Sequence, residues 1–409
     1  MENAKEKPIN KLRDLFENYF PAFEFKYPQY ATHHVKQTIQ KILSCRTVVL
    51  GCKLYGCVEH GFGRVIPFSC GNRFCVSCAN ARGQAWLDEA VAVLTSIDTS
   101  YHFITITVPG SISQIIKFNK KLLLSEFFSS ASGSLIYWSR KRGFLPGFVM
   151  VMQTSGDRLN FHVHIHLLIT SGGLFFNRWI KNLHYPPDAI LKSFKTLIFR
   201  ALRRAYLNQD FVSPPEYADN ACSSKEDFNK FLGKLWEINW NLHIAKDLKK
   251  AKDILGYIAR YLKKPPISNS RIIEYDDSKI VFMARDYEKK KRLPYIMSLG
   301  YFFISLFEHV PIAHFPMVRW YGLFSNRNKK KYIELLQGLI PSKELKEKLD
   351  PRPLWRIKYE QKHGIDPLAC PVCKKEMELL FCFSARMIKE LGFLSFEEIL
   401  RAFCFIQSF

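Results

Sequence analysis

Three histidines alternate with bulky apolar residues in the stretch FHVHIHL, residues 161–167. A period of two is typical of a β-strand, on which successive side chains point to opposite faces of the sheet. His162, His164 and His166 are therefore expected on one face, with the intervening apolar residues on the other. The apolar face would pack against a core, which leaves the histidine face to be presented to a ligand.

The spacing of these histidines predicts a metal site made by two of them. Residues i and i+2 lie roughly 6.6 Å apart along a strand, so two neighbouring imidazoles can converge on one ion. The outer two lie about 13 Å apart, so the site is expected at one adjacent pair. A third ligand is needed, and Gln153 is well placed across a predicted hairpin to supply its carbonyl oxygen. The alternative is that the histidines are structural.

Charge identifies the class of partner. The 409-residue chain has 60 Lys and Arg against 37 Asp and Glu, a net charge of +23. Such a charge on a folded protein predicts a polyanion, with nucleic acid first and an anionic membrane surface second. Basic runs at 200–204, 289–292 and 329–331 would follow a DNA backbone. The sequence has no apolar leader and no long uncharged apolar stretch, so we expect no membrane span and a cytoplasmic protein.

Cysteines are concentrated near the N-terminus, where six of the 11 lie between residues 45 and 78. Without an export signal, clustered cysteines are interpreted as metal ligands before disulfides. Cys57-x-x-His60 and Cys75-x-x-Cys78 supply two ligand pairs, as a tetrahedral structural Zn²⁺ requires. We therefore predict one zinc site made by these four residues. The competitors for a place in it are Cys70 first, then Cys45 and Cys52.

A further pair of cysteines, Cys370-x-x-Cys373, lies near the C-terminus. The pair has no obvious second half in the sequence around it. His363 and Cys382 are the nearest candidates to complete a metal site.

Two tyrosines at helical spacing occur in ILGYIARYLKK, residues 254–264. Tyr257 and Tyr261 are i and i+4 neighbours on one helical face. Taken alone the pattern favours packing. Beside a metal-binding histidine strand and a strongly basic chain, it favours nucleophiles that attack a phosphate, because a bound divalent ion would assist an otherwise weak tyrosine hydroxyl. The basic residues expected to contact DNA here are Arg260, Lys263, Lys264 and Arg271.

Pattern and propensity predict an α+β protein. Helices are expected at residues 10–20, 80–96, 187–208 and 226–263. Strands are expected at residues 101–108, 147–153, 160–170, 267–284 and 292–299. Three parts follow: an N-terminal helix and zinc domain at 1–95, a core at 96–335 and a C-terminal tail at 336–409.

Five segments occur in a familiar order, namely SCGNRFCVSC, YHFITITVP, LPGFVMVMQTSGDRLNFHVHIHLLIT, YIARYLKKPPISNSRI and HFPMVRWYGLFSNR. Together they resemble the two-tyrosine HUH-endonuclease transposases of rolling-circle insertion sequences, over roughly residues 10–335. The resemblance implies an antiparallel-sheet HUH nuclease core with surrounding helices, preceded by a small zinc-knuckle domain. This sequence departs from the family pattern at three positions. Val163 stands where the family usually has a proline, His60 stands where it usually has a cysteine, and Gln153 stands where a histidine is more usual.

The resemblance also implies site residues and a reaction. His164, His166 and Gln153 would hold Mg²⁺ or Mn²⁺, and Tyr257 and Tyr261 would be the nucleophiles. The protein would nick and rejoin single-stranded DNA at element ends through a 5′-phosphotyrosine intermediate. Two alternatives remain: a plasmid replication initiator or relaxase with the same chemistry, and a non-catalytic zinc-knuckle DNA-binding protein.

Overall fold

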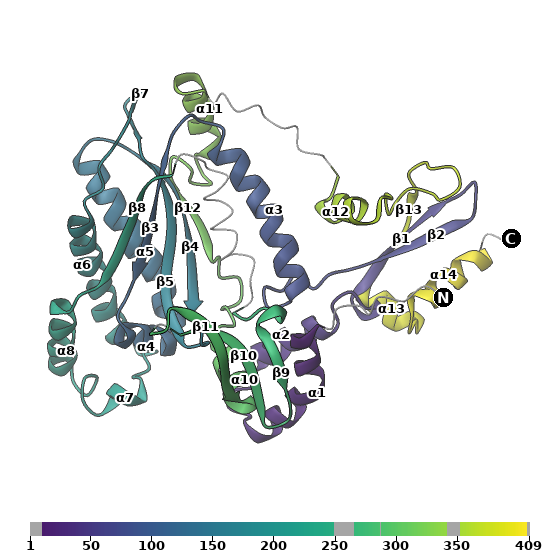
Figure 1. The fold of residues 1–409 in the computed structure, drawn as a ribbon, viewed down its shortest axis with the longest axis horizontal. Coiled ribbons are helices and arrows are strands. Elements are labelled where there is room, and N and C mark those ends of the chain that lie inside the picture. Colours follow the sequence, from purple (N-terminus) through teal and green to yellow (C-terminus); the bar gives the residue numbers. More distant parts are fainter. Residues whose placement is uncertain (1–9, 249–265, 287, 342–351, 407–409) are drawn as a thin grey trace. The chain divides into compact units, whose positions relative to one another are not determined.

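The computed structural model describes residues 10–248, 266–286, 288–341 and 352–406. Within these residues the protein is α+β with antiparallel sheets, as predicted. The chain forms two compact units, each discontinuous in sequence (Figure 1). The first combines Met1–Ala85, Lys263–Phe282 and Glu347–Phe409, and the second combines Trp86–Leu262 and Met283–Lys346. The three-part division that we predicted is linear, whereas both of these units are assembled from separate segments.

A five-stranded antiparallel sheet forms the centre of the second unit, with the strand order β12-β4-β5-β3-β8. Its strands are β3 (Tyr101–Thr107), β4 (Gly147–Ser155), β5 (Phe161–Thr170), β8 (Asn241–Leu248) and β12 (Val318–Gly322). The histidine strand is β5, and it occupies the middle of the sheet. The predicted strands at 101–108, 147–153 and 160–170 are thus confirmed.

Helices cover both faces of this sheet (Figure 1). The helices of the second unit are α4 (Gly110–Phe118), α5 (Lys120–Lys141), α6 (Pro187–Tyr206), α7 (Pro215–Ala218), α8 (Lys225–Glu237), α10 (Leu299–Phe307) and α11 (Lys329–Leu339), with the C-terminal part of α3 (Val76–Leu94). Val163, Ile165 and Leu167 lie in a core cluster with buried residues of α4, α5, α6 and α8. On the opposite face, Leu168 packs with α3 and α11 in a second cluster. The alternation along β5 therefore separates a fully apolar face from the histidine face.

One predicted element is wrong. The helix expected over residues 226–263 ends as α8 at Glu237, and residues 241–248 form the edge strand β8 instead. Leu242 and Ile244 pack against the core cluster beneath α4, α5, α6 and α8, whereas Ala245 packs against the cluster beneath α3 and α11. This alternation has the period of a strand, and pairing with β3 outweighs the helical propensity of the flanking residues.

The first unit contains a β-hairpin, a strand from the C-terminal segment and several helices. The hairpin strands β1 (Gly51–Cys57) and β2 (Phe62–Pro67) form a sheet with β13 (Glu378–Ser384) in the order β13-β1-β2. Their shared core is a small cluster built around Cys52, Leu54 and Phe383. The helices are α1 (Lys11–Lys26), α2 (His33–Leu43), the N-terminal part of α3, α12 (Leu354–His363), α13 (Ala385–Leu391) and α14 (Phe396–Ile406).

Residues 266–282 are fastened to α1 by polar contacts. The Lys11 ammonium donates to the Ile272 carbonyl at 2.8 Å, and the Tyr275 hydroxyl donates to Asp14 at 2.8 Å. The remaining short elements are η1 (Val48–Leu50), η2 (Asn269–Arg271), β6 (Gly173–Phe175), β7 (Arg178–Ile180), β9 (Ile272–Tyr275), β10 (Lys279–Asp286) and β11 (Lys291–Ser298). In the described part of the chain, no helix combines the length and hydropathy that a membrane span requires.

Candidate functional site

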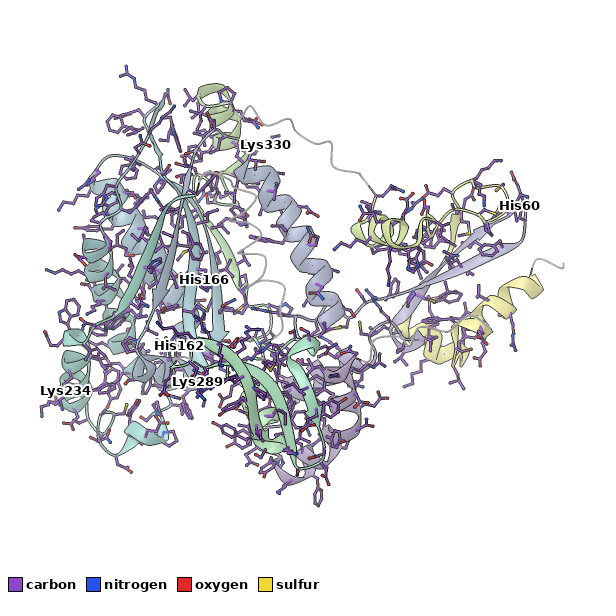
Figure 2. All side chains as sticks on the ribbon, viewed as in Figure 1. His60, His162, His166, Lys234, Lys289 and Lys330 are labelled. Carbon is purple, nitrogen blue, oxygen red and sulfur yellow. The ribbon has the colours of Figure 1, made fainter. Side chains whose placement is uncertain are left out.

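The histidine face of β5 changes from polar to apolar along the strand. His164 lies directly between Gln153 of β4 and Thr107 of β3, and His166 is opposite Thr105 of β3. Directly opposed residues share a face in an antiparallel sheet. The next row along β5 is wholly apolar and belongs to the cluster beneath α3 and α11. The polar rows therefore form a bounded site, and Figure 2 shows His162 and His166 along this strand.

His164 and Gln153 are in direct contact. The Nδ1–H group of His164 donates to the His162 carbonyl at 2.9 Å, because a carbonyl oxygen only accepts. Burial, more than the nearby His162, lowers the pKa of His164 to about 4, so the ring is neutral at pH 7. The Nε2 atom then carries a lone pair, and it lies 2.9 Å from Gln153 Oε1.

This separation fits two ligand atoms of one ion. Neighbouring ligands in an octahedral site with bonds of about 2.1 Å lie about 3.0 Å apart. The same two groups form a hydrogen bond when the amide presents its NH₂ group, so both side chains are held in place with or without an ion. A β-bulge follows at Gln153–Ser155, which is the kind of irregularity that redirects side chains beside functional sites.

His166 is the more deeply buried of the pair. Its Nδ1 atom lies 3.2 Å from the Thr105 hydroxyl, and its ring stacks on Phe103 with centroids 5.5 Å apart. The rings of His164 and His166 are perpendicular, with centroids 4.8 Å apart. Burial first, and His164 second, lower the pKa of His166 to about 3. Both imidazoles are therefore neutral at pH 7, which is the form that binds metal.

The structure describes one of the six other residues predicted for the nuclease site. Tyr257, Tyr261, Arg260, Lys263 and Lys264 lie outside the described residues. Arg271 is half-buried in η2 of the first unit. Its guanidinium donates to the Pro266 carbonyl at 3.4 Å and lies over the ring of Phe282 at 5.5 Å. Its expected contact with DNA stays a prediction.

One further histidine on the same face of the sheet was not predicted from the sequence. His243 of β8 is opposite Thr105 of β3, and it is exposed. Because each strand adds about 4.8 Å, His243 lies two strands from His166, roughly 10 Å across the sheet. The alternation of Leu242 and Ile244 was the signal for this strand, and a helical interpretation of residues 226–263 concealed it.

Basic runs that we expected to follow DNA are partly engaged in ion pairs. Arg204 lies 2.7 Å from Glu126, and Lys329 lies 2.9 Å from Glu89. Arg292 lies 3.3 Å from Asp157. Exposed pairs of this kind contribute little to stability, so these side chains remain accessible to a competing polyanion.

Four cysteines of the first unit form a compact cluster. Cys45, Cys70, Cys75 and Cys78 have ligand atoms that all lie within 4.8 Å of one another. The Sγ atoms of Cys45 and Cys78 are 3.5 Å apart, those of Cys70 and Cys78 are 3.6 Å apart, and those of Cys45 and Cys75 are 3.6 Å apart. A tetrahedral zinc site with Zn–S bonds of about 2.3 Å has S···S edges of about 3.8 Å. The cluster therefore fits a structural Zn²⁺.

Local backbone geometry supports this cluster. Gly71 has a φ of +60°, so the chain turns tightly between Cys70 and Asn72. The Asn72 amide donates to Cys70 Sγ at 3.4 Å, and the Cys70 amide donates to Cys45 Sγ at 3.4 Å. Contact with Cys70 lowers the pKa of Cys45 to about 6, which favours the thiolate that zinc binds.

The predicted zinc ligand set is thereby corrected. Cys75 and Cys78 are joined by Cys45 and Cys70, whereas Cys57 and His60 lie in a separate group with Cys370 and Cys373. The reason is the β1–β2 hairpin, whose pairing extends from Cys52↔Pro67 to Cys57↔Phe62. Five residues of strand carry Cys57 and His60 about 17 Å from the base of the hairpin, beyond the reach of one ion. Figure 2 shows His60 at the hairpin tip.

Comparisons with known proteins match two segments of the chain to family models. Residues 147–331 match the family model described as "Putative transposase", and residues 15–108 match the "Transposase zinc-binding domain" model. The chain is 28% identical over 363 residues to the transposase for insertion sequence element IS801 of Pseudomonas savastanoi pv. phaseolicola, covering 87% of this chain and 86% of that protein. It is 26% identical over 377 residues to "Putative transposase y4qJ" of Sinorhizobium fredii, covering 89% and 92% of the two chains. No solved structure matches significantly.

The two matched models and both relatives identify the chain as a transposase. They support an IS91-family transposase with an N-terminal zinc-binding domain.

Proposed function

We propose that this transposase cleaves and rejoins single-stranded DNA at the ends of its insertion sequence through a 5′-phosphotyrosine intermediate. The observation that carries the proposal is the pair of neutral histidines on the central strand, His166 buried and His164 half-buried, with Gln153 Oε1 2.9 Å from His164 Nε2. A histidine with a structural role usually forms its hydrogen bonds alone, whereas here two perpendicular imidazole rings and an amide oxygen lie together in one bounded patch. The names of the relatives and the matched zinc-binding domain favour a transposase over a replication initiator.

His164, His166 and Gln153 would hold Mg²⁺ or Mn²⁺. Their mixed nitrogen and oxygen donors suit these ions when phosphate oxygens complete the coordination. When bound, the ion would withdraw charge from the scissile phosphate and stabilise the leaving oxygen. Thr105 would orient the His166 ring, and the His162 carbonyl would fix the tautomer of His164.

Tyr257 and Tyr261 would be the nucleophiles. The phenolic oxygen gives up its proton and forms a bond to phosphorus, while the bond from phosphorus to the 3′ oxygen breaks and that oxygen takes up a proton. The products are a 5′-phosphotyrosine and a free 3′ hydroxyl. Attack by a 3′ hydroxyl on the phosphotyrosine reverses these changes and rejoins DNA without ATP. With two tyrosines, one can hold the first strand while the second accepts another.

A denaturing gel tests the proposal. Purified protein is mixed with Mn²⁺ and end-labelled single-stranded oligonucleotides from both ends of the element. We expect an SDS-resistant adduct that the Tyr257→Phe, Tyr261→Phe double variant does not form, and an adduct with full yield for Tyr137→Phe. Tyr137 is a suitable control because it is 63% exposed on α5.

The same gel distinguishes the alternatives. Adducts that survive in the double variant would refute the assignment of the nucleophiles. Tight DNA binding in a native gel, together with no adduct from the natural protein on either strand, would favour a non-catalytic zinc-knuckle DNA-binding protein.

A further inference from the structure

A second group of metal-ligating side chains lies at the tip of the β1–β2 hairpin. Cys57, His60, Cys370 and Cys373 have ligand atoms that all lie within 4.8 Å of one another. Cys57 Sγ is 3.8 Å from Cys373 Sγ and 3.4 Å from His60 Nδ1. The matched zinc-binding domain ends at residue 108, so it leaves two of these four residues unaccounted for.

The distances fit zinc better than a disulfide. With Zn–S bonds of about 2.3 Å and a Zn–N bond of about 2.05 Å, a tetrahedral site has an S···S edge of about 3.8 Å and an S···N edge of about 3.6 Å. The observed separations agree with these edges within about 0.2 Å. A disulfide would need sulfurs about 2.05 Å apart, and it would leave the third thiol and the imidazole without a role.

Two turns of the same design supply the ligands. Each offers two ligands separated by two residues, and in each the residue after the second ligand is left-handed, Gly61 at φ +59° and Lys374 at φ +61°. In the hairpin turn the His60 amide donates to the Cys57 carbonyl at 3.3 Å. In the C-terminal turn the Lys374 amide donates to the Cys370 carbonyl at 2.9 Å. A non-glycine residue in this conformation is uncommon, and here it allows the second knuckle.

Neighbouring contacts hold the two turns against each other. The Arg64 guanidinium donates to the Pro367 carbonyl at 2.9 Å, and Lys375 lies 3.0 Å from Glu59. Beside them β13 pairs with β1, so that Gly56 is opposite Glu378. A Cβ atom at Gly51 would collide with the Phe383 carbonyl of β13, so the two strands approach closely there.

We propose that Cys57, His60, Cys370 and Cys373 hold a second structural Zn²⁺, which fastens the C-terminal segment to the N-terminal zinc-binding domain. The ion joins residues that are more than 300 positions apart in the sequence. Residues 364–384 are then part of the zinc module, since they supply half of this site and the third strand of its sheet. Three thiolates and one imidazole are an established type of structural zinc ligand set.

Zinc content per chain tests the proposal. Full-length natural protein and single-residue variants are dialysed against metal-free buffer, and zinc is measured by mass spectrometry. We expect Cys373→Ser to contain one zinc equivalent fewer than Cys382→Ser. Cys382 is a matched control, because it lies exposed on the same segment and belongs to neither ligand group. Equal zinc in the two variants would overturn the proposal.

A second variant keeps the test decisive if Cys373→Ser does not fold. His60→Cys preserves four ligands, so the protein should retain its zinc and its fold. With Co²⁺ in place of zinc, His60→Cys should gain thiolate-to-cobalt charge-transfer absorption relative to the natural protein. An unchanged cobalt spectrum would show that His60 is not a ligand and would refute the proposed set.

Discussion

Replacing Gln153 by alanine removes the oxygen that lies 2.9 Å from His164 Nε2 and leaves the histidine pair in place. The side chain is only half-buried, at the end of β4, so the change should leave the fold intact. Loss of even an outer-shell group that orients a metal ligand typically costs 10- to 100-fold in affinity. That range corresponds to about 1.4 to 2.7 kcal/mol. We therefore expect the Kd for Mn²⁺ to rise by about 10- to 100-fold.

Isothermal titration with Mn²⁺ at pH 7.5 measures this change directly. Gln153→His should restore affinity, because an imidazole supplies a donor in the same direction. His162→Ala provides the matched control: it removes the third histidine of the strand but keeps the backbone carbonyl that holds His164 Nδ1. Unaltered Mn²⁺ affinity in Gln153→Ala, or a loss in His162→Ala as large as that in His166→Asn, would refute the assignment of the ligands.

Three further predictions concern the two histidines, the apolar core and the four-cysteine cluster. Burial lowers the pKa of His164 to about 4 and of His166 to about 3, so the unfolded chain binds more protons below about pH 6.5. The free energy of unfolding of the metal-free protein should thus fall from pH 6.5 towards pH 4, by up to about 1.4 kcal/mol per pH unit for each histidine. In urea titrations, the double variant His164→Gln, His166→Gln should lack this slope. Ile165→Ala removes a fully buried side chain from the core cluster beneath α4, α5, α6 and α8, which should lower the free energy of unfolding by about 2 to 5 kcal/mol in the same titrations. An unchanged urea midpoint would contradict the packing. Cys75→Ser should lose one zinc equivalent and lower the melting temperature, and full zinc retention would exclude the four-cysteine cluster as its site.

The histidine face was predictable from local pattern alone. Alternation over residues 161–167 determines which side chains share a face, and the structure confirms that Val163 and Ile165 lie in the core. The contact between Gln153 and His164 follows from the hairpin that joins β4 to β5.

The zinc ligands were not predictable from spacing, because spacing does not reveal which pairs meet. Cys57-x-x-His60 and Cys75-x-x-Cys78 look like one site, yet the hairpin between them moves one pair away from the other. The partners of Cys57 come from Cys370 and Cys373, which only the pairing of β1 with β13 brings near. The edge strand β8 was missed for a related reason: its strand character depends on pairing with β3, and the flanking residues favour a helix.

Peptide mapping of the adduct tests most directly whether Tyr257 and Tyr261 form covalent bonds to DNA. Trypsin cleavage after Lys252, Arg260 and Lys263 places the two tyrosines on separate peptides, 253–260 and 261–263. Mass spectrometry of nuclease-trimmed adduct should find a nucleotide linked through phosphate to Tyr257, to Tyr261 or to both. A phosphate-linked nucleotide found only on another residue, such as a serine or a different tyrosine, would contradict the account.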